Sequence, residues 1–374
     1  MPSSRAIRIT AFVTPRIRHH ARVWGLAFCL GWTVVASVTQ VNAACPVEGS
    51  VSNAGAALIK KLPSSCTKAE REIHAVDGAS ILESLRNGQP VELTGVIVRG
   101  DVDFGRLPAH TVGEGNRTGS DQPEQAGTQE VRLVRGALTI RESVVLGAVR
   151  HRSSTGTLQF EAPVDFHGTT FKDGVDLSRS LFQGPVELAE AVFQKEAYFV
   201  QGRFMQGLGC KETKFGPHTR FHRSLFRGAV DCTGALFDGM AEWLEVTFEQ
   251  PAVFERVRFG SGTGFSGSQF MQQAAFPDAI FSRDTFFTFS VFQEEAVFAG
   301  GQFLGSVDFS DADFKKPDDL ARARFDQPPI LIRTRRVAQE PPVNDLATFF
   351  RQHGLTAMLL LVSAGLVGYI LTRK

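Results

Sequence analysis

The feature that most constrains this fold is a regular series of large apolar residues between positions 160 and 314. From Phe160 onward, the spacing alternates between six and five residues without a break as far as Phe314. Of the 29 positions in the series, 24 are Phe, and the others are Leu177, Leu188, Cys210, Cys232 and Trp243. The whole chain has 32 Phe but only 2 Tyr and 3 Trp. So strict a pattern predicts a structural repeat.

The spacing does not fit an α-helix, because apolar residues do not recur at i, i+3, i+4 and i+7. Small residues often stand two positions before each large one, and turn-forming residues often follow it. We therefore predict a solenoid in which each unit forms one short side and points a small and a large residue inward. Four sides give a coil of about 22 residues, so that Phe stacks on Phe. A two-sided coil of half that length is the alternative.

The series also extends towards the N-terminus with less regularity. The same spacing places Thr155, Val149, Val144, Leu138 and Leu133 in line with it, and Thr155 is the one polar residue among them. An earlier start at Leu93, Val98 and Phe104 is a further option. We expect these residues to belong to the same apolar core.

Segments such as residues 164–182 (VDFHGTTFKDGVDLSRSLF) and 296–314 (AVFAGGQFLGSVDFSDADF) resemble the Phe-rich branch of the pentapeptide-repeat family. The resemblance covers about half of the chain, although the alternating 5/6 spacing departs from the family's strict step of five. It implies a right-handed quadrilateral β-helix with one repeat on each side. The fold class we expect is therefore all-β, with about 22 residues per coil, short capping helices and a C-terminal transmembrane helix.

We divide the chain by these patterns. Residues 44–92 are predicted to form an N-terminal cap with a short helix over 77–88, and residues 93–314 the repeat domain. Within it, the polar stretch 105–129 lacks the repeat and is predicted to be a loop insertion. Residues 315–344 are expected to hold a second capping helix and then a Pro-rich stalk.

The two ends predict export and membrane attachment. Residues 1–43 combine an Arg-rich start, an apolar run and small residues before Ala44, which predicts a signal peptide; an uncleaved anchor is the alternative. Within a predicted juxtamembrane and transmembrane segment over 345–372, residues 355–372 carry no charge, and Arg373 and Lys374 follow. We expect a bacterial inner-membrane protein with a single C-terminal anchor and its body in the periplasm.

Four cysteines remain beyond the predicted signal peptide. Cys45 and Cys66 flank a short segment and are predicted to form a disulfide. Cys210 and Cys232 both occupy the apolar series, four steps apart, so a four-sided coil would stack them within disulfide range. Two reduced core thiols are the alternative for this second pair.

The main candidate surface is a run of basic residues within one coil: Lys211, Lys214, Arg220, His222, Arg223 and Arg227. Such a basic band would suit an anionic glycan, a lipid head group or an acidic partner. An ordinary charged surface is the alternative, since Glu242 would stack one coil beyond Arg220. Tyr198 and the off-series residues Phe286 and Phe289 are predicted to add an apolar contact patch, unless a local bulge buries the two Phe.

Chemistry-bearing motifs are few. The sequence has no nucleophile elbow, zinc-protease motif, Walker loop or Cys-x-x-Cys. The acids that precede positions of the series scatter over coils and sides, as on a solvated surface: Asp165, Asp176, Glu187, Asp231, Glu242 and Asp308. The formal net charge of +1 argues against nucleic-acid binding and against DNA mimicry, the activity most associated with the resembled family. We expect no catalytic residues, no metal and no cofactor.

The sequence is compatible with three functions. The first is a non-enzymatic, membrane-tethered scaffold or interaction module with a protein partner in the cell envelope. The second is a binding module for anionic cell-envelope polysaccharide or lipopolysaccharide through the basic band. The third, an enzyme acting on a polymer along the coils, would require clustered carboxylates.

Overall fold

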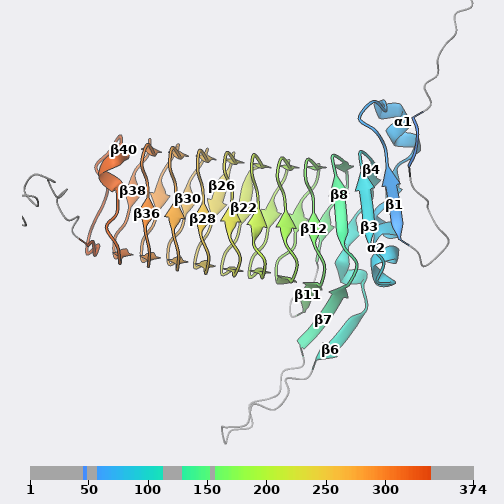
Figure 1. The fold of residues 1–374 in the computed structure, drawn as a ribbon, viewed down its shortest axis with the longest axis horizontal. Coiled ribbons are helices and arrows are strands. Elements are labelled where there is room, and N and C mark those ends of the chain that lie inside the picture. The colour runs from blue at the N-terminus through green and yellow to red at the C-terminus, as the bar shows by residue number, and fades with distance from the viewer. Residues whose placement is uncertain (1–44, 49–56, 113–128, 152–155, 338–374) are drawn as a thin grey trace, which may run out of the picture. The chain divides into compact units, whose positions relative to one another are not determined.

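The computed structural model describes residues 45–48, 57–112, 129–151 and 156–337. The predicted signal peptide and the predicted transmembrane helix lie outside these residues. The described part folds into an all-β solenoid of right-handed type with about ten coils, which follow one another along a single axis (Figure 1). Each regular coil contributes one short strand to each of four parallel sheets, here called A to D in the order in which a coil visits them.

The strands of these sheets have the following bounds. Sheet A contains β1 (Leu58–Lys61), β3 (Val91–Thr94), β8 (Leu138–Arg141), β12 (Val164–Asp165), β16 (Val186–Glu187), β20 (Leu208–Gly209), β24 (Val230–Asp231), β28 (Ala252–Val253), β32 (Ala274–Ala275) and β36 (Ala296–Val297). Sheet B contains β2 (Val76–Asp77), β4 (Ile97–Arg99), β9 (Val144–Val145), β13 (Thr170–Phe171), β17 (Val192–Phe193), β21 (Lys214–Phe215), β25 (Leu236–Phe237), β29 (Arg258–Phe259), β33 (Ile280–Phe281), β37 (Gln302–Phe303) and β40 (Arg324–Phe325).

The other two sheets complete the coils. Sheet C contains β5 (Val102–Asp103), β10 (Val149–Arg150), β14 (Val175–Asp176), β18 (Ala197–Tyr198), β22 (His218–Arg220), β26 (Met240–Glu242), β30 (Thr263–Gly264), β34 (Thr285–Phe286) and β38 (Val307–Asp308). Sheet D contains β6 (Ala109–Val112), β7 (Gln129–Val134), β11 (Thr157–Phe160), β15 (Ser180–Phe182), β19 (Arg203–Phe204), β23 (Leu225–Phe226), β27 (Thr247–Phe248), β31 (Gln269–Phe270), β35 (Val291–Phe292) and β39 (Asp313–Phe314).

The register between strands confirms the four-sided coil of about 22 residues and rules out the two-sided one. Phe171 lies beside Phe193, and Phe193 beside Phe215, on successive strands of sheet B. All 24 Phe of the alternating series are at most 2% exposed. Their rings stack along the axis, as in Phe270 and Phe292, whose centroids are 4.9 Å apart and whose planes differ by 1°. The apolar side chains of all four sheets therefore form one continuous core.

The alternation of five and six residues follows from the geometry of the corners. Each five-residue step turns the A–B or C–D corner through one residue with positive φ, such as Gly168 (φ 63°) or Arg223 (φ 55°). The turn is closed by a backbone hydrogen bond, as where the N–H of Thr169 donates to the carbonyl of Phe166 at 3.0 Å. The B–C and D–A corners use one residue more. Two tight corners and two wider ones thus produce the observed coil length.

Two helices accompany the first coil. Helix α1 (Lys68–Ile73) begins with a capping box between Thr67 and Glu70. Helix α2 (Gly78–Arg86) lies within the helix predicted over 77–88 and buries Ile81, Leu82 and Leu85. The solenoid nevertheless begins earlier than the expected residue 93, because β1 and β2 already pair with β3 and β4.

The irregular coil before Phe160 differs from the expected series. Phe160 lies beside Val134 rather than Leu133, since this coil is longer than the regular ones. The inward positions of that coil belong to Val134, Ile140, Val145 and His151. The earlier option of Leu93, Val98 and Phe104 is confirmed, because all three are fully buried. Because this coil is longer than the others, counting back from Phe160 in steps of five and six residues gives the wrong inward positions.

The predicted loop over 105–129 is not wholly irregular. Its first residues complete the turn η1 (Phe104–Arg106), and β6 then pairs antiparallel with β7. These two strands form an arm that extends from the solenoid beside β11 (Figure 1). Backbone pairing therefore orders both ends of this polar insertion.

The C-terminal end also differs from expectation. The second capping helix is only the single 3₁₀ turn η2 (Leu320–Arg322), and the first part of the expected stalk continues the coils. Ile330 bridges to Asp308, and Arg335 bridges to Asp313. Asp318, whose side chain is 1% exposed, accepts hydrogen bonds of 2.7 and 2.6 Å from Nε and Nη2 of Arg336. This ion pair joins the segment after η2 to the residues that precede η2. Among the described residues, no helix has the length and apolar character needed to cross a membrane.

Candidate interaction surface

The residues of the basic band do not share one face of the solenoid. Lys211 lies at the A–B corner, Lys214 projects from sheet B and Arg220 from sheet C. His222 and Arg223 lie at the C–D corner, and Arg227 follows sheet D. Because the run covers most of one coil, its members surround the axis, and the structure does not bring them together.

Acids in the next coil also neutralise most of this band. Arg220 pairs with Glu242 at 2.5 Å, Arg223 with Glu245 at 2.7 Å, Arg227 with Glu249 at 3.6 Å and Lys211 with Asp231 at 3.0 Å. His222 also lies 3.6 Å from Glu245. The hydrogen bond from Arg223 lowers the pKa of Glu245 below its usual value. Among the described residues, only Lys214 of the six has no ion pair.

The scattered acids have a structural role at the corners. Asp165 accepts a hydrogen bond from the N–H of His167 at 3.0 Å, and Asp176 accepts one from Ser178 at 3.0 Å. The same contact, from the N–H two residues later, recurs at Glu187, Asp231 and Asp308. These carboxylates satisfy backbone donors where the chain turns.

Both cysteine pairs are disulfides in the structure. Cys45 and Cys66 have Cα atoms 5.2 Å apart and join the N-terminal segment to the cap. Cys210 and Cys232, with Cα atoms 4.4 Å apart, cross-link two successive coils inside the core. Both members of the second pair are fully buried, so this bridge lies away from the surface.

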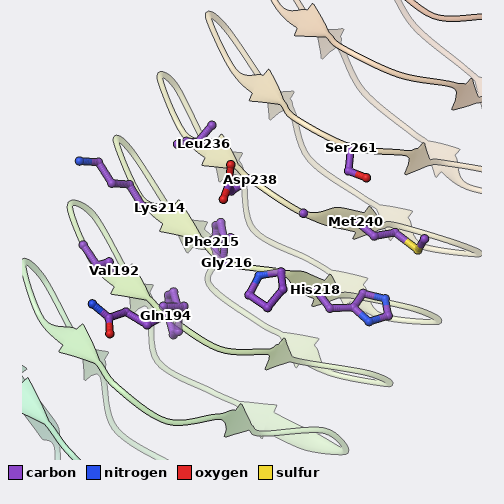
Figure 2. Close-up of a pocket in the computed structure, with 13 residues that line it drawn as sticks. Val192, Gln194, Lys214, Phe215, Gly216, His218, Leu236, Asp238, Met240 and Ser261 are labelled. Atoms are coloured by element: carbon purple, nitrogen blue, oxygen red, sulfur yellow. The ribbon is translucent and has the colours of Figure 1, made fainter. Parts of the chain in front are cut away.

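A groove of about 930 Å³ follows the B–C corner over several coils, and Figure 2 shows the residues that line it. Val192, Lys214 and Leu236 line it from sheet B, and His218 and Met240 from sheet C. Glycines keep the corner narrow here, because a Cβ on Gly239 would lie 1.8 Å from the carbonyl oxygen of Pro217. The groove combines the half-buried Val192 and Leu236 and the exposed Met240 with Asp238 and with Lys214, which has no ion pair among the described residues.

Sheet C carries outward-facing aromatic residues next to this groove. Its outward positions on successive coils are Tyr198, Arg220, Glu242, Gly264 and Phe286. The guanidinium carbon of Arg220 lies 5.3 Å from the centre of the Tyr198 ring. We call the outward side of sheet C, with the B–C groove and the C–D corner residue Phe289, the sheet C surface.

Two Phe on this surface break the rule that Phe is buried. Phe286 is 44% exposed and Phe289 is 64% exposed, so no bulge buries them. Phe289 also has φ 58°, at a corner position that is polar or Gly in the neighbouring coils: Arg223, Glu245, Gly267, Asp311 and Arg333. A left-handed conformation costs a non-Gly residue about 1–2 kcal/mol. Phe289 therefore combines a strained backbone conformation with an exposed aromatic ring.

Sequence reasoning identified Tyr198, Phe286 and Phe289 but missed the groove. Val192, Lys214 and Leu236 lie at intervals of one coil in the chain, and only the register between coils brings them side by side. The same holds for His218 and Met240. Aligning the sequence in rows of one coil each would have placed Val192, Lys214 and Leu236 in one column. The narrow glycine corner itself has no comparable sequence pattern.

Comparisons with family models, curated proteins and solved structures find no match to this chain. Within the described residues, no group of three or more His, Cys, Asp or Glu is placed to hold a metal ion. The interpretation of the surface therefore depends on its own geometry.

Proposed function

We propose that this chain is a membrane-tethered, periplasm-facing pentapeptide-repeat protein that acts as a non-enzymatic scaffold for a protein partner in the cell envelope. The partner docks on the sheet C surface. The family assignment is supported by the four-sided coils and by the stacked Phe core. The location in the bacterial inner membrane is supported by the sequence of the two ends.

The observation that carries the proposal is the exposed ring of Phe289. A solvent-exposed Phe in a left-handed corner contributes little to folding, because the ring is 64% exposed and the backbone is strained. Exposed aromatic residues are enriched at the centres of protein interfaces. Phe286 and Met240, 44% and 45% exposed, add apolar area to the same surface.

The alternative, binding of anionic polysaccharide or lipopolysaccharide through the basic band, has less support. The six residues surround one coil, and five of them lie beside a carboxylate. A ligand approaching one face would therefore meet only one or two of these residues, with their charges already partly neutralised.

The test is capture of partners by full-length protein from its own membranes in mild detergent, comparing wild type with Phe289→Asn. Asn tolerates the left-handed conformation better than Phe, so the fold should stay intact or gain stability. We expect a stoichiometric protein partner with the wild type and a loss of at least about tenfold in its recovery with Phe289→Asn.

Arg256→Asn is the matched control, since Arg256 (φ 52°) occupies the equivalent left-handed position at the A–B corner. It should retain the partner. Equal recovery with Phe289→Asn and wild type would exclude Phe289 from the interface. Recovery of glycan or lipopolysaccharide in place of any protein would reject the scaffold function.

A further inference from the structure

A second groove, unrelated to the sheet C surface, lies on sheet D. It has a volume of about 560 Å³ and is lined by Val131, Thr157, Gln159, Arg179, Ser180, Leu181, Gln201, Arg203 and Arg223. These residues come from β7, β11, β15, β19 and the C–D corners of three successive coils. The groove thus begins at the base of the β6–β7 arm and continues along the solenoid axis.

The charge of this groove is entirely positive. Arg179, Arg203 and Arg223 line it, and none of its lining residues is Asp or Glu. Arg223 is paired with Glu245, and Nε of Arg179 donates to Oε1 of Gln201 at 3.1 Å. Arg203 is exposed, and the described residues provide no ion pair for it. Guanidinium groups are strong donors to phosphate, sulfate and carboxylate.

The floor of the groove carries neutral side chains. Successive residues of a strand face opposite sides, and in β15 Ser180 and Phe182 are buried whereas Leu181 is partly exposed. The hydroxyl of Ser180 therefore faces the core and not the groove. The outward side chains that a ligand can contact beside the arginines are Gln159, Leu181 and Gln201.

We propose that the sheet D groove binds an anionic polysaccharide chain, with oxyanions on Arg203 and Arg179 and sugar hydroxyls on the amides of Gln159 and Gln201. Arg179 and Arg223 lie two coils apart, about 10 Å along the axis, which spans more than one small anion. Gln159 and Gln201 supply neutral donors and acceptors, and Leu181 supplies an apolar patch for a sugar face. This site shares only Arg223 with the basic band and does not depend on the partner proposed for sheet C.

The test measures binding of the full-length protein in detergent to heparin oligosaccharides (sulfated), oligogalacturonate (carboxylated), neutral dextran, poly-glutamate and inorganic phosphate. We expect at least one anionic saccharide to bind, with an affinity that falls as salt rises, and dextran not to bind. Arg203→Gln should weaken this binding about tenfold or more. Arg258→Gln, which removes an exposed arginine from the outward side of sheet B, should change it less than about twofold.

Thermal unfolding must show both variants folded, and Gln159→Ala, at an outward residue of β11, should weaken binding without lowering stability. Equal losses in Arg203→Gln and Arg258→Gln would show attraction to the whole charged surface and overturn the site. Binding of poly-glutamate alone would indicate an acidic protein ligand, and binding of phosphate alone a free anion. Either result, or the absence of any binding, rejects the polysaccharide. None of these outcomes bears on capture of a partner through Phe289.

Discussion

Nε of Arg220 donates a hydrogen bond to a carboxylate oxygen of Glu242 at 2.5 Å, and the two residues are 22 positions apart on adjacent strands of sheet C. The same separation joins Arg223 to Glu245 and Arg333 to Asp311. The coil length that stacks Phe inside therefore also pairs opposite charges outside. The basic residues of this coil therefore face acidic residues of the next coil, and the two sets have to be considered together.

A double-mutant cycle on Arg220→Ala and Glu242→Ala measures this pairing. Since both side chains are partly exposed, we expect a coupling free energy below about 1 kcal/mol in urea unfolding. Raising the salt concentration should reduce it further. A coupling well above this value would mean that the pair supports the coil and does not merely neutralise the surface.

Replacing Phe254 tests the stacked core. This ring is fully buried and stacks on Phe276 with centroids 5.0 Å apart. We expect Phe254→Ala to lower the free energy of unfolding by about 3–5 kcal/mol, and Phe254→Asp to unfold the neighbouring coils, because the carboxylate would have no partner. Hydrogen exchange should show the loss centred on β28. A soluble Phe254→Asp protein with unchanged hydrogen exchange would contradict the register. Phe289→Ala is the control: because this ring is exposed, the free energy of unfolding should stay almost that of wild type.

His151 should make the stability of the solenoid depend on pH. His151 is 5% exposed, and burial lowers its pKa. The charge of Arg132 lowers the pKa further, whereas the carbonyl of Ser178 and the carboxylates of Asp176 and Asp103 act in the opposite direction. The unfolded chain therefore binds a proton at a higher pH than the folded one. Neutral, buried His151 therefore makes its full contribution to the free energy of unfolding above the pKa of an unfolded His, about 6.5. This contribution is lost as the pH falls below that pKa.

The measurement is the unfolding midpoint between about pH 7.5 and about pH 5. We expect wild type to lose more stability over this window than His151→Leu, since Leu177 shows that Leu fits the corresponding position in the next coil. His110→Gln, at an exposed residue of β6, should retain the wild-type dependence. Parallel pH profiles for wild type and His151→Leu would show that His151 is not the responsible group.

The disulfide between Cys210 and Cys232 should resist reduction while the protein is folded. Both residues are fully buried, so a reductant cannot reach the sulfurs without opening the core. Alkylation and mass spectrometry after treatment with a thiol reductant should detect these cysteines only in denaturant, whereas Cys45, which is partly exposed, should react earlier. Replacing both core cysteines by Ala should cost about 2–4 kcal/mol. Rapid labelling of Cys232 in the native protein would show that these coils open readily.

The candidate sites were less visible in the sequence than the core was. Phe286 and Phe289 were predictable because they fall outside an otherwise unbroken series. Arg179 and Arg203 were missed, since they belong to different coils and their neighbours in the chain carry no distinctive charge. The six basic residues were grouped because they are close together in the sequence. Successive residues of a coil face different directions, so residues that are close in the sequence need not share a surface.

The sequence by itself determined the repeat, the stacking of Phe and the all-β class, because burial must recur with the period of the coil and leaves that period in the chain. The tertiary structure decided where the solenoid begins and ends, that His151 takes an inward position, and which surface residues meet. Those outcomes depend on changes in the length of single coils, such as the longer coil before Phe160, and on contacts between residues at least one coil apart in the chain. Outward positions lose little solvent contact on folding, so no apolar periodicity marks them in the sequence, and only the stacking of coils assembles them into surfaces.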